Sequence, residues 1–233
     1  MNCTGIIGAM EIEVENLKKQ MTDVSVVRKA GIDFFVGRLS GKKAVVARSR
    51  VGKVNAAVCT QIMIDDFGVD AVINTGVAGS LNAMINIGDI VLSTDVVQHD
   101  VDAGCFGYRK GQIPQMAEFS FTADQNLRTL AEAACRTANP DIQVFQGRIL
   151  SGDQFVSDRR VKEEIVREFG GFAVEMEGAA IGQTAYVNGV PFLIIRAISD
   201  KADGSAEMDY DAFEAEAARH STRLTLELLR QLS

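Results

Sequence analysis

The chain has 233 residues, of which 47% are hydrophobic and 24% are charged, so it can form a globular protein with a sizeable core. Its formal net charge is −7 and its basic residues form no cluster, which argues against a nucleic-acid-binding surface. No apolar run approaches the ~20 residues of a membrane-spanning helix, and the N-terminus lacks the segments of a signal peptide, so we expect neither.

The first half of the chain alternates short apolar runs with helical patterns. An apolar run that stops at Gly8 predicts a buried strand, and Val14 and Leu17 lie at helical spacing just after it. Gly68 follows another helical pattern, as is typical of a helix end. The predicted elements are a strand ending at residue 8, a helix from residue 11, a β-hairpin of residues 34–39 and 44–47, a helix at 54–67, a strand at 71–74 and a glycine loop at 75–80.

The second half continues this alternation around one long irregular segment. Residues 99–120 have no period and predict a long loop, and such loops inside compact domains are usually functional. The other predicted elements are strands at 88–93, 144–149 and 191–198, and helices at 127–138, 161–169, about 176–187 and about 210–232. Buried strands alternating with helices predict a single α/β domain over residues 1–233, with helices on both faces of a mostly parallel sheet that the hairpin makes mixed.

Several predicted strands end in polar or glycine-rich clusters, and open α/β sheets bind ligands at such an edge. The most informative cluster is Val174-Glu175-Met176-Glu177, where two carboxylates two residues apart would face the same space on an extended strand end. The alternative is the acidic first turn of a helix, which the helix dipole favours equally well. The clusters together predict an unusually acidic pocket, and their ranges are 11–13, 75–80, 151–155, 175–177 and 199–200.

Individual residues in these clusters leave two interpretations open. Asp200 at the rim of an apolar strand has the environment of a general acid, but Asp is also a preferred helix N-cap. Glu13 is either a general base for water or a solvated first-turn acid. The glycines of residues 76–79 form a tight turn or allow close approach to a sugar, and the segment lacks both GxGxxG and the P-loop lysine.

Metal and nucleophile chemistry have weaker support. His99 and His220 lie away from the acidic clusters, no EF-hand spacing occurs, and neither histidine has a GxSxG or cysteine partner. The sequence therefore predicts no metal site. The four cysteines lie far apart with no CxxC pair, which favours reduced thiols in a cytoplasmic protein.

Five ordered motifs closely resemble the 5'-methylthioadenosine/S-adenosylhomocysteine nucleosidases of the nucleoside phosphorylase superfamily. They are IIGAMEIEV at 6–14, NTGVAG at 74–79, SGDQF at 151–155, VEME at 174–177 and RAISD at 196–200. The resemblance implies a three-layer α/β/α sandwich with a mixed, mostly parallel central sheet, usually a homodimer. It also implies hydrolysis of the N-glycosidic bond of 5'-thioadenosines to adenine and a substituted ribose, without a cofactor.

Carried over by position, the resemblance assigns the reaction to two carboxyl groups. Asp200 would protonate N7 of the departing adenine, and Glu13 would activate the attacking water. Glu177 would bind the ribose hydroxyls, with Met176 packed beside the sugar, and Phe155 would stack on adenine. The further site residues implied are Val156, Gly79, Ser199, Arg196, Glu175, Phe106 from a dimer partner, and Phe213 as a wall of the alkylthio pocket.

One position departs from the family pattern. Several members carry a serine where this chain has Val77, and valine cannot donate the hydrogen bond that helps to place the water. The acids of residues 8–13 would still repel an anionic nucleophile, which favours water over phosphate. Two alternatives to the leading function are a futalosine-type nucleosidase and a nucleoside-binding protein without turnover.

Overall fold

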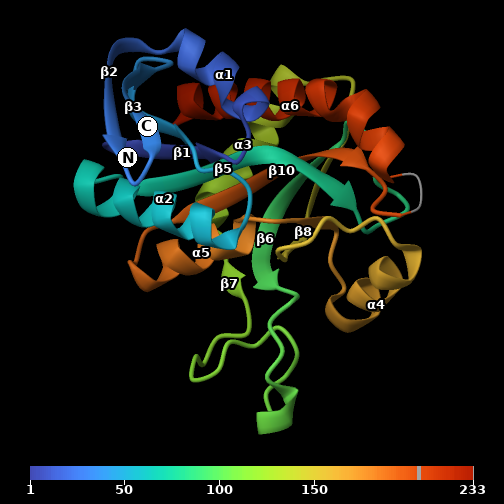
Figure 1. The fold of residues 1–233 in the computed structure, drawn as a ribbon. Coiled ribbons are helices and arrows are strands. Elements are labelled where there is room, and N and C mark those ends of the chain that lie inside the picture. The colour runs from blue at the N-terminus through green and yellow to red at the C-terminus, as the bar shows by residue number, and fades with distance from the viewer. Residues whose placement is uncertain (204–205, 233) are drawn as a thin grey trace.

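The computed structural model describes residues 1–203 and 206–232. Its ten strands form one sheet in the order β10-β6-β8-β9-β5-β1-β4-β3-β2, with β7 beside β6 (Figure 1). The strands are β1 (Thr4–Gly8), β2 (Thr22–Lys29), β3 (Ile32–Leu39), β4 (Lys42–Arg48), β5 (Ala71–Ser80), β6 (Ile90–Gln98), β7 (Phe121–Thr122), β8 (Val144–Ser151), β9 (Ala173–Glu175) and β10 (Phe192–Asp200). The helices are α1 (Glu11–Gln20), α2 (Lys53–Phe67), the short η1 (Gly104–Phe106), α3 (Gln125–Ala138), α4 (Arg159–Phe169), α5 (Gly178–Val187) and α6 (Ala206–Gln231).

The sheet is mixed, as predicted. Parallel pairs join β1 to β4 and β5, β5 to β10, and β8 to β6 and β9. Antiparallel pairs include the predicted hairpin of β3 and β4, and also β10 with β6 and β5 with β9. Because β10 pairs with both β5 and β6, the strands β10, β6, β8, β9 and β5 close into a ring. This ring brings the ends of β5, β9 and β10 to one place.

Helices cover both faces of the sheet, which confirms the α/β/α layers. Helices α1, α3 and α6 lie on one face, and α2 and α5 pack together on the other (Figure 1). The core between the layers is aliphatic, with Ile6, Ile73, Leu193 and Leu228 fully buried. A second apolar cluster anchors α4 through Ile165 and Phe169 over the ends of β6, β8 and β9. None of the helices in the described ranges is long and apolar enough to cross a membrane.

The predicted glycine loop at 75–80 is wrong. Strand β5 continues through all ten residues to Ser80, because β10 pairs with it from Phe192↔Val72 to Ile198↔Ala78 and β9 pairs with Gly79. Strand β2 was not predicted from the sequence; its residues are mostly exposed, so it carries no run of buried apolar side chains. The predicted loop at 99–120 contains only η1 and extends away from the body of the molecule (Figure 1).

Candidate active site

A cavity of about 500 Å³ opens where β5, β9 and β10 end. This volume is within the range of small-molecule sites. The cavity collects predicted residues from five separate parts of the chain: Glu13, Val77, Gly79, Phe155, Glu175, Met176, Glu177, Arg196, Ser199 and Asp200. Val156 borders a small adjoining cavity that shares Gly79, Phe155 and Asp200. The strand-end clusters therefore do meet at one edge of the sheet.

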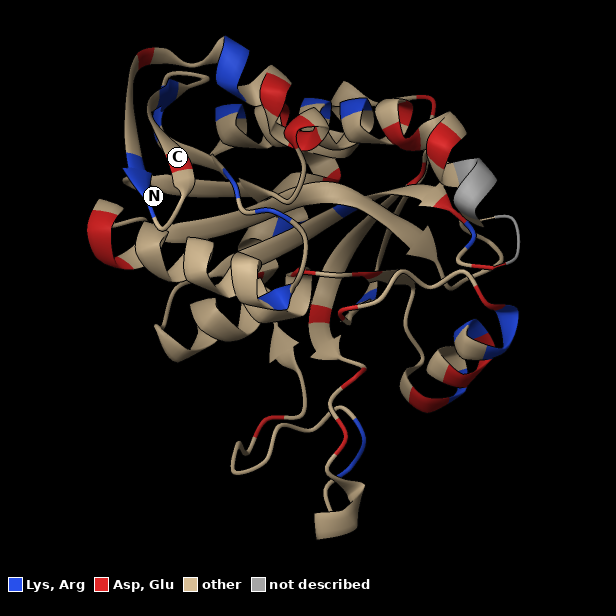
Figure 2. Ribbon diagram, in the orientation of Figure 1, with Lys and Arg blue, Asp and Glu red and all other residues tan. Residues whose placement is uncertain are grey.

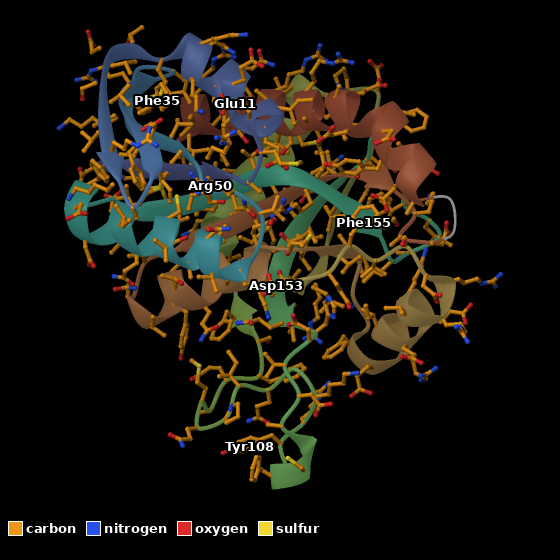
Figure 3. The ribbon with its side chains drawn as sticks, in the orientation of Figure 1. Glu11, Phe35, Arg50, Tyr108, Asp153 and Phe155 are labelled. Atoms are coloured by element: carbon orange, nitrogen blue, oxygen red, sulfur yellow. The ribbon has the colours of Figure 1, made fainter. Side chains whose placement is uncertain are left out.

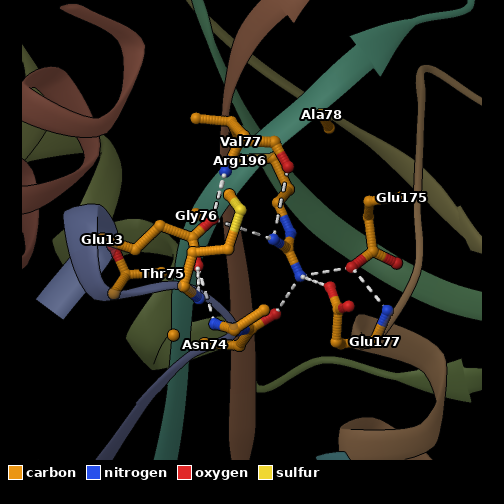
Figure 4. Close-up of polar contacts among 12 residues, drawn as sticks. Glu13, Asn74, Thr75, Gly76, Val77, Ala78, Glu175, Glu177 and Arg196 are labelled. Atoms are coloured by element: carbon orange, nitrogen blue, oxygen red, sulfur yellow. Dashed lines mark hydrogen bonds and ion pairs between the residues drawn. The ribbon is translucent and has the colours of Figure 1, made fainter. Parts of the chain in front are cut away.

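Arg196 lies at the centre of the buried polar groups around this cavity (Figure 4). Its side chain is only 1% exposed and is anchored by Nη2 on Asn74 Oδ1 at 2.5 Å and by Nη1 on the Val77 carbonyl at 3.3 Å. Nη2 also contacts Glu175 directly and lies 3.4 Å from Glu177 Oε2, while Nη1 lies 4.0 Å from Glu13 Oε1. Burial lowers the pKa of Arg196, but these three carboxylates outweigh burial and raise its pKa. The guanidinium therefore stays charged and holds the acids together.

Glu13 is held by backbone donors on both of its oxygens. Oε2 accepts from the N–H groups of Ala9 at 2.6 Å and Met10 at 2.9 Å, and Oε1 accepts from Val77 N–H at 3.1 Å. The side chain is 1% exposed, which rules out the solvated first-turn interpretation. Burial raises the pKa of Glu13 above its ordinary value, against the opposing effect of Arg196 and these three donors. A carboxyl of raised pKa facing a cavity suits proton transfer near neutral pH.

Glu175 and Glu177 converge on Arg196 by different routes. Glu175 ends β9 and accepts from the N–H groups of Glu177 at 3.1 Å and Gly178 at 2.8 Å, and also from Ser151 Oγ. Glu177 precedes α5, and its Oε1 accepts from Gly52 N–H at 2.9 Å. Burial and the neighbouring Glu175 charge raise the pKa of Glu177 to about 7, although Arg196 opposes them. Glu177 therefore titrates near neutral pH.

Asp200 lies at the end of β10 and also borders the cavity. Oδ2 accepts from Ser199 Oγ at 2.9 Å and Oδ1 accepts from Ala202 N–H at 2.8 Å. The next helix begins at Ala206, so Asp200 is not an N-cap. The residue is only 2% exposed. The cavity thus has Glu13 and Arg196 in its wall together with a separately held carboxyl at Asp200.

Comparison with known proteins agrees with this geometry. The Phosphorylase superfamily model matches residues 4–230. A 5'-methylthioadenosine/S-adenosylhomocysteine nucleosidase of Staphylococcus carnosus is 43% identical over 229 residues, covering 98% of this chain and 99% of that protein. This chain belongs to the 5'-methylthioadenosine/S-adenosylhomocysteine nucleosidase family.

Solved structures of related proteins share the fold over their whole length. The nucleosidase of Neisseria meningitidis, in complex with methylthio-immucillin-A, superposes with a TM-score of 0.96 at 42% identity over 100% of both chains. A futalosine hydrolase of Helicobacter pylori superposes with a TM-score of 0.94 at 36% identity, over 99% of this chain and 98% of that one. The nucleoside phosphorylase-like fold is therefore confirmed.

Gly76 and Gly79 lie within β5 and form no turn. Their missing side chains allow polar side chains of the site to approach the strand closely. A Cβ on Gly76 would lie 2.5 Å from Glu13 Oε1 and still closer to Arg196, and a Cβ on Gly79 would lie 2.7 Å from Asp200 Oδ1. Neither glycine has a positive φ, so backbone strain does not explain them. They leave room for the polar side chains of the site.

We expect Gly76→Ala to lower the free energy of unfolding by about 1–3 kcal/mol, because the methyl group overpacks a buried ion cluster. Urea titration measures this change. Gly104→Ala is the matched control, since its nearest neighbour is the exposed Asp102 side chain at 3.3 Å, and it should leave the midpoint unchanged. Equal midpoints for the two variants would contradict the close-packing argument.

The aromatic wall of the cavity differs in part from the prediction. Phe155 lies there and meets the Tyr210 ring edge-on, with 5.7 Å between centroids and 82° between planes. Phe213 instead borders a separate small cavity beside Ile87 and His220. Phe106 is 80% exposed on η1, far from this cavity within one chain. Tyr210 thus occupies the wall of the cavity, which Phe213 does not reach in this chain.

Three further residues support the site and were not assigned from the sequence. Asn74 anchors Arg196, Ser151 bonds Glu175, and Tyr210 donates its hydroxyl to Glu214 Oε1 at 2.7 Å. Asn74 and Ser151 lie inside the recognisable motifs, so the motifs carried a signal for them. The carboxylates and histidines of the described ranges form no group of three or more that could hold a metal ion.

Proposed function

We propose that this protein hydrolyses the N-glycosidic bond of 5'-methylthioadenosine and S-adenosylhomocysteine, and of 5'-deoxyadenosine in addition, to adenine and the 5-substituted ribose. The proposal treats residues 1–233 as one catalytic domain that needs no cofactor. The observation that carries it is the single cavity bordered by Glu13, Glu177 and Asp200. The relatives named above, 43% and 42% identical, carry the corresponding name.

The residues suit a reaction that develops charge at both ends of one bond. Adenine leaves readily only when N7 is protonated, and Asp200 is the carboxyl for that step, with Ser199 holding its second oxygen at 2.9 Å. The ribose becomes oxocarbenium-like as the bond breaks, as in glycoside hydrolysis. The carboxylates of Glu175 and Glu177 stabilise this positive charge, and Glu177 accepts hydrogen bonds from the ribose hydroxyls.

Glu13 takes the proton of the attacking water. Its backbone donors, Val77 N–H among them, hold the carboxylate at the cavity wall, where Val77 itself is only 7% exposed. Because valine offers no hydroxyl, water is placed by Glu13, Arg196 and main-chain groups alone. Phe155 stacks on the base, with the Val156 main chain at its edge, Met176 lies beside the sugar, and Gly79 permits the approach to Asp200.

Release of free adenine from 5'-methylthioadenosine in phosphate-free buffer tests this function. We expect turnover there, and tight binding without adenine release would favour the non-catalytic alternative. The H. pylori futalosine hydrolase at 36% identity makes a futalosine-type substrate the second candidate. Competition between the two nucleosides separates them, and preferred cleavage of futalosine would replace the leading substrate.

We also propose a homodimer in which a second copy covers α2 and α5. These helices carry exposed apolar residues, with Val54 at 74% and Val187 at 61% exposure. Charged residues lie only at the ends of α2, and α5 has none (Figure 2). Phe106 would then reach the partner's alkylthio pocket. Sedimentation equilibrium tests this, and a monomer at assay concentration would exclude it.

The four free thiols support a cytoplasmic location.

Nucleoside affinity should depend on the ionisation of Glu177, whose pKa is raised to about 7 by burial and by Glu175. Above this pH the carboxylate accepts from the ribose hydroxyls, and below it the protonated group accepts less well. We expect the affinity for a non-hydrolysable C-nucleoside to fall by up to about tenfold per pH unit below neutrality. Calorimetry at several pH values measures it. Glu177→Gln should bind weakly at every pH, and a flat wild-type profile would contradict the assignment.

A further inference from the structure

Lys53, Asp100 and Asp153 join three chain segments in a closed ring of contacts, which lies outside the cavity but next in sequence to Gly52 and near Phe155. Lys53 Nζ donates to Asp100 Oδ1 at 2.6 Å, and Lys53 N–H donates to Asp153 Oδ1 at 2.8 Å. Asp153 N–H then donates to Asp100 Oδ2 at 2.9 Å. The three residues begin α2, follow β6 and follow β8, respectively. The ring therefore fixes three loops relative to one another.

On one side, the ring fixes the position of the Gly52 N–H group, which donates to Glu177. Gly52 immediately precedes Lys53, and its N–H bonds Glu177 Oε1 at 2.9 Å. Gly52 has a φ of 100°, a conformation that favours glycine, and a Cβ there would lie 3.2 Å from Asp153 Oδ1. The direction of this N–H group therefore depends on how the chain is held at Lys53 and Asp153.

On the other side, the ring fixes the position of the segment that carries Phe155. Asp153 and Phe155 are two residues apart in the loop after β8, and both are labelled in Figure 3. Phe155 is 47% exposed, so core packing does not fix the orientation of its phenyl group. The segment is anchored instead by Asp153 and by Gly152, which donates to the Glu175 carbonyl at 3.1 Å and packs on His99. Displacing Asp153 would move the aromatic wall.

The ring is partly withdrawn from water. The Lys53 and Asp100 side chains are 16% and 28% exposed, and Lys53 also donates to Gln98 Oε1 at 3.0 Å. Burial raises the pKa of Asp100, but the bonds from Lys53 and from Asp153 N–H outweigh it and lower the pKa. Asp100 therefore stays ionised and accepts from both partners.

We propose that Lys53, Asp100 and Asp153 are positioning residues. They align the ribose-binding carboxylate of Glu177 with the base-stacking phenyl group of Phe155. This inference rests on the proposed function. Because the ring touches neither the nucleophile end nor Asp200, its loss should weaken nucleoside binding more than it slows bond cleavage.

The test compares Lys53→Met with Lys53→Arg, and uses Lys18→Met as the matched control. Lys18 is 13% exposed and pairs with Glu11 at 2.9 Å, but it lies outside the cavity. In Lys53→Met we expect KM for 5'-methylthioadenosine to rise about tenfold, with kcat within about threefold of wild type. Lys53→Arg should recover most of the affinity, since it keeps a cation for Asp100. Lys18→Met should match wild type in both constants.

The pH profile supplies a readout that simple destabilisation would not move. Gly52 N–H lowers the pKa of Glu177 together with Arg196, against burial and the charges of Glu175 and Glu13. When the ring is broken this donor is lost, so the pH below which a C-nucleoside loses affinity should shift upward in Lys53→Met. Unchanged KM and an unchanged profile would overturn the proposal. A loss of kcat and melting temperature that Lys53→Arg does not rescue would also overturn it.

This outcome is distinguishable from failure of the proposed function. Wild-type adenine release decides the function, whereas the ratio of variant to wild type decides the role of the ring. If the wild type releases no adenine, calorimetric binding of the C-nucleoside to the same variants still tests the ring.

Discussion

Asp200→Asn is expected to lower kcat for adenine release by about 10²–10⁴-fold while the protein remains folded. The amide cannot deliver a proton to N7, which is the step that makes adenine a competent leaving group. The fold should survive, because Asn keeps an oxygen for Ala202 N–H and a polar partner for Ser199 Oγ. Nucleoside affinity should change little, so the loss appears in kcat and not in KM.

Asp95→Asn provides the matched control. Asp95 pairs with Arg148 at 2.6 Å and its side chain is 15% exposed, so its carboxylate is mostly sheltered but lies outside the cavity. Asp95→Asn should lower the free energy of unfolding somewhat and leave kcat unchanged. If Asp200→Asn retains near-wild-type kcat, Asp200 is not the acid.

Arg196→Met should produce the largest loss of stability, about 3–5 kcal/mol in the free energy of unfolding. The change leaves Glu13, Glu175 and Glu177 buried without the guanidinium that they surround. Arg196 lowers the pKa of both Glu13 and Glu177, so these carboxyls should protonate more readily without it. The stability deficit should therefore shrink as the pH falls from about 8 to about 5. Urea titration at several pH values measures both effects.

Arg136→Met is the comparison for an exposed pair. Arg136 is 70% exposed and bonds Glu132 at 2.7 Å one helical turn away, so its loss should cost at most about 1 kcal/mol. An Arg196→Met deficit of similar size, or one that does not depend on pH, would mean that Arg196 does not hold the carboxylates in the fold.

Local signals in the sequence were sufficient for most of the framework. The helix ends at Gly68 and Gly170 follow from glycines that adopt φ values of 60° and 64°, which need no tertiary partner. The β3–β4 hairpin is also local. The acidic clusters could be placed at one edge because parallel strands end together, and the cavity confirms their convergence.

Other features depend on contacts that are distant in the chain. Strand β5 continues through its glycines because β10 and β9 pair with it from about a hundred residues away. The central place of Arg196 arises only when β9, α1 and β10 meet. Tyr210 borders the cavity, whereas Phe213 on the same helix borders a separate one. These features are determined by tertiary packing, and local sequence patterns do not predict them.

The most direct test of the account follows the oxygen that enters the sugar. Wild-type protein is incubated with 5'-methylthioadenosine in water enriched in the heavy oxygen isotope, once without and once with phosphate, and both products are analysed by mass spectrometry. We predict free adenine, together with one heavy oxygen in the methylthioribose. Failure to release adenine, or release that requires phosphate and yields a sugar phosphate, would contradict hydrolysis by a Glu13-activated water.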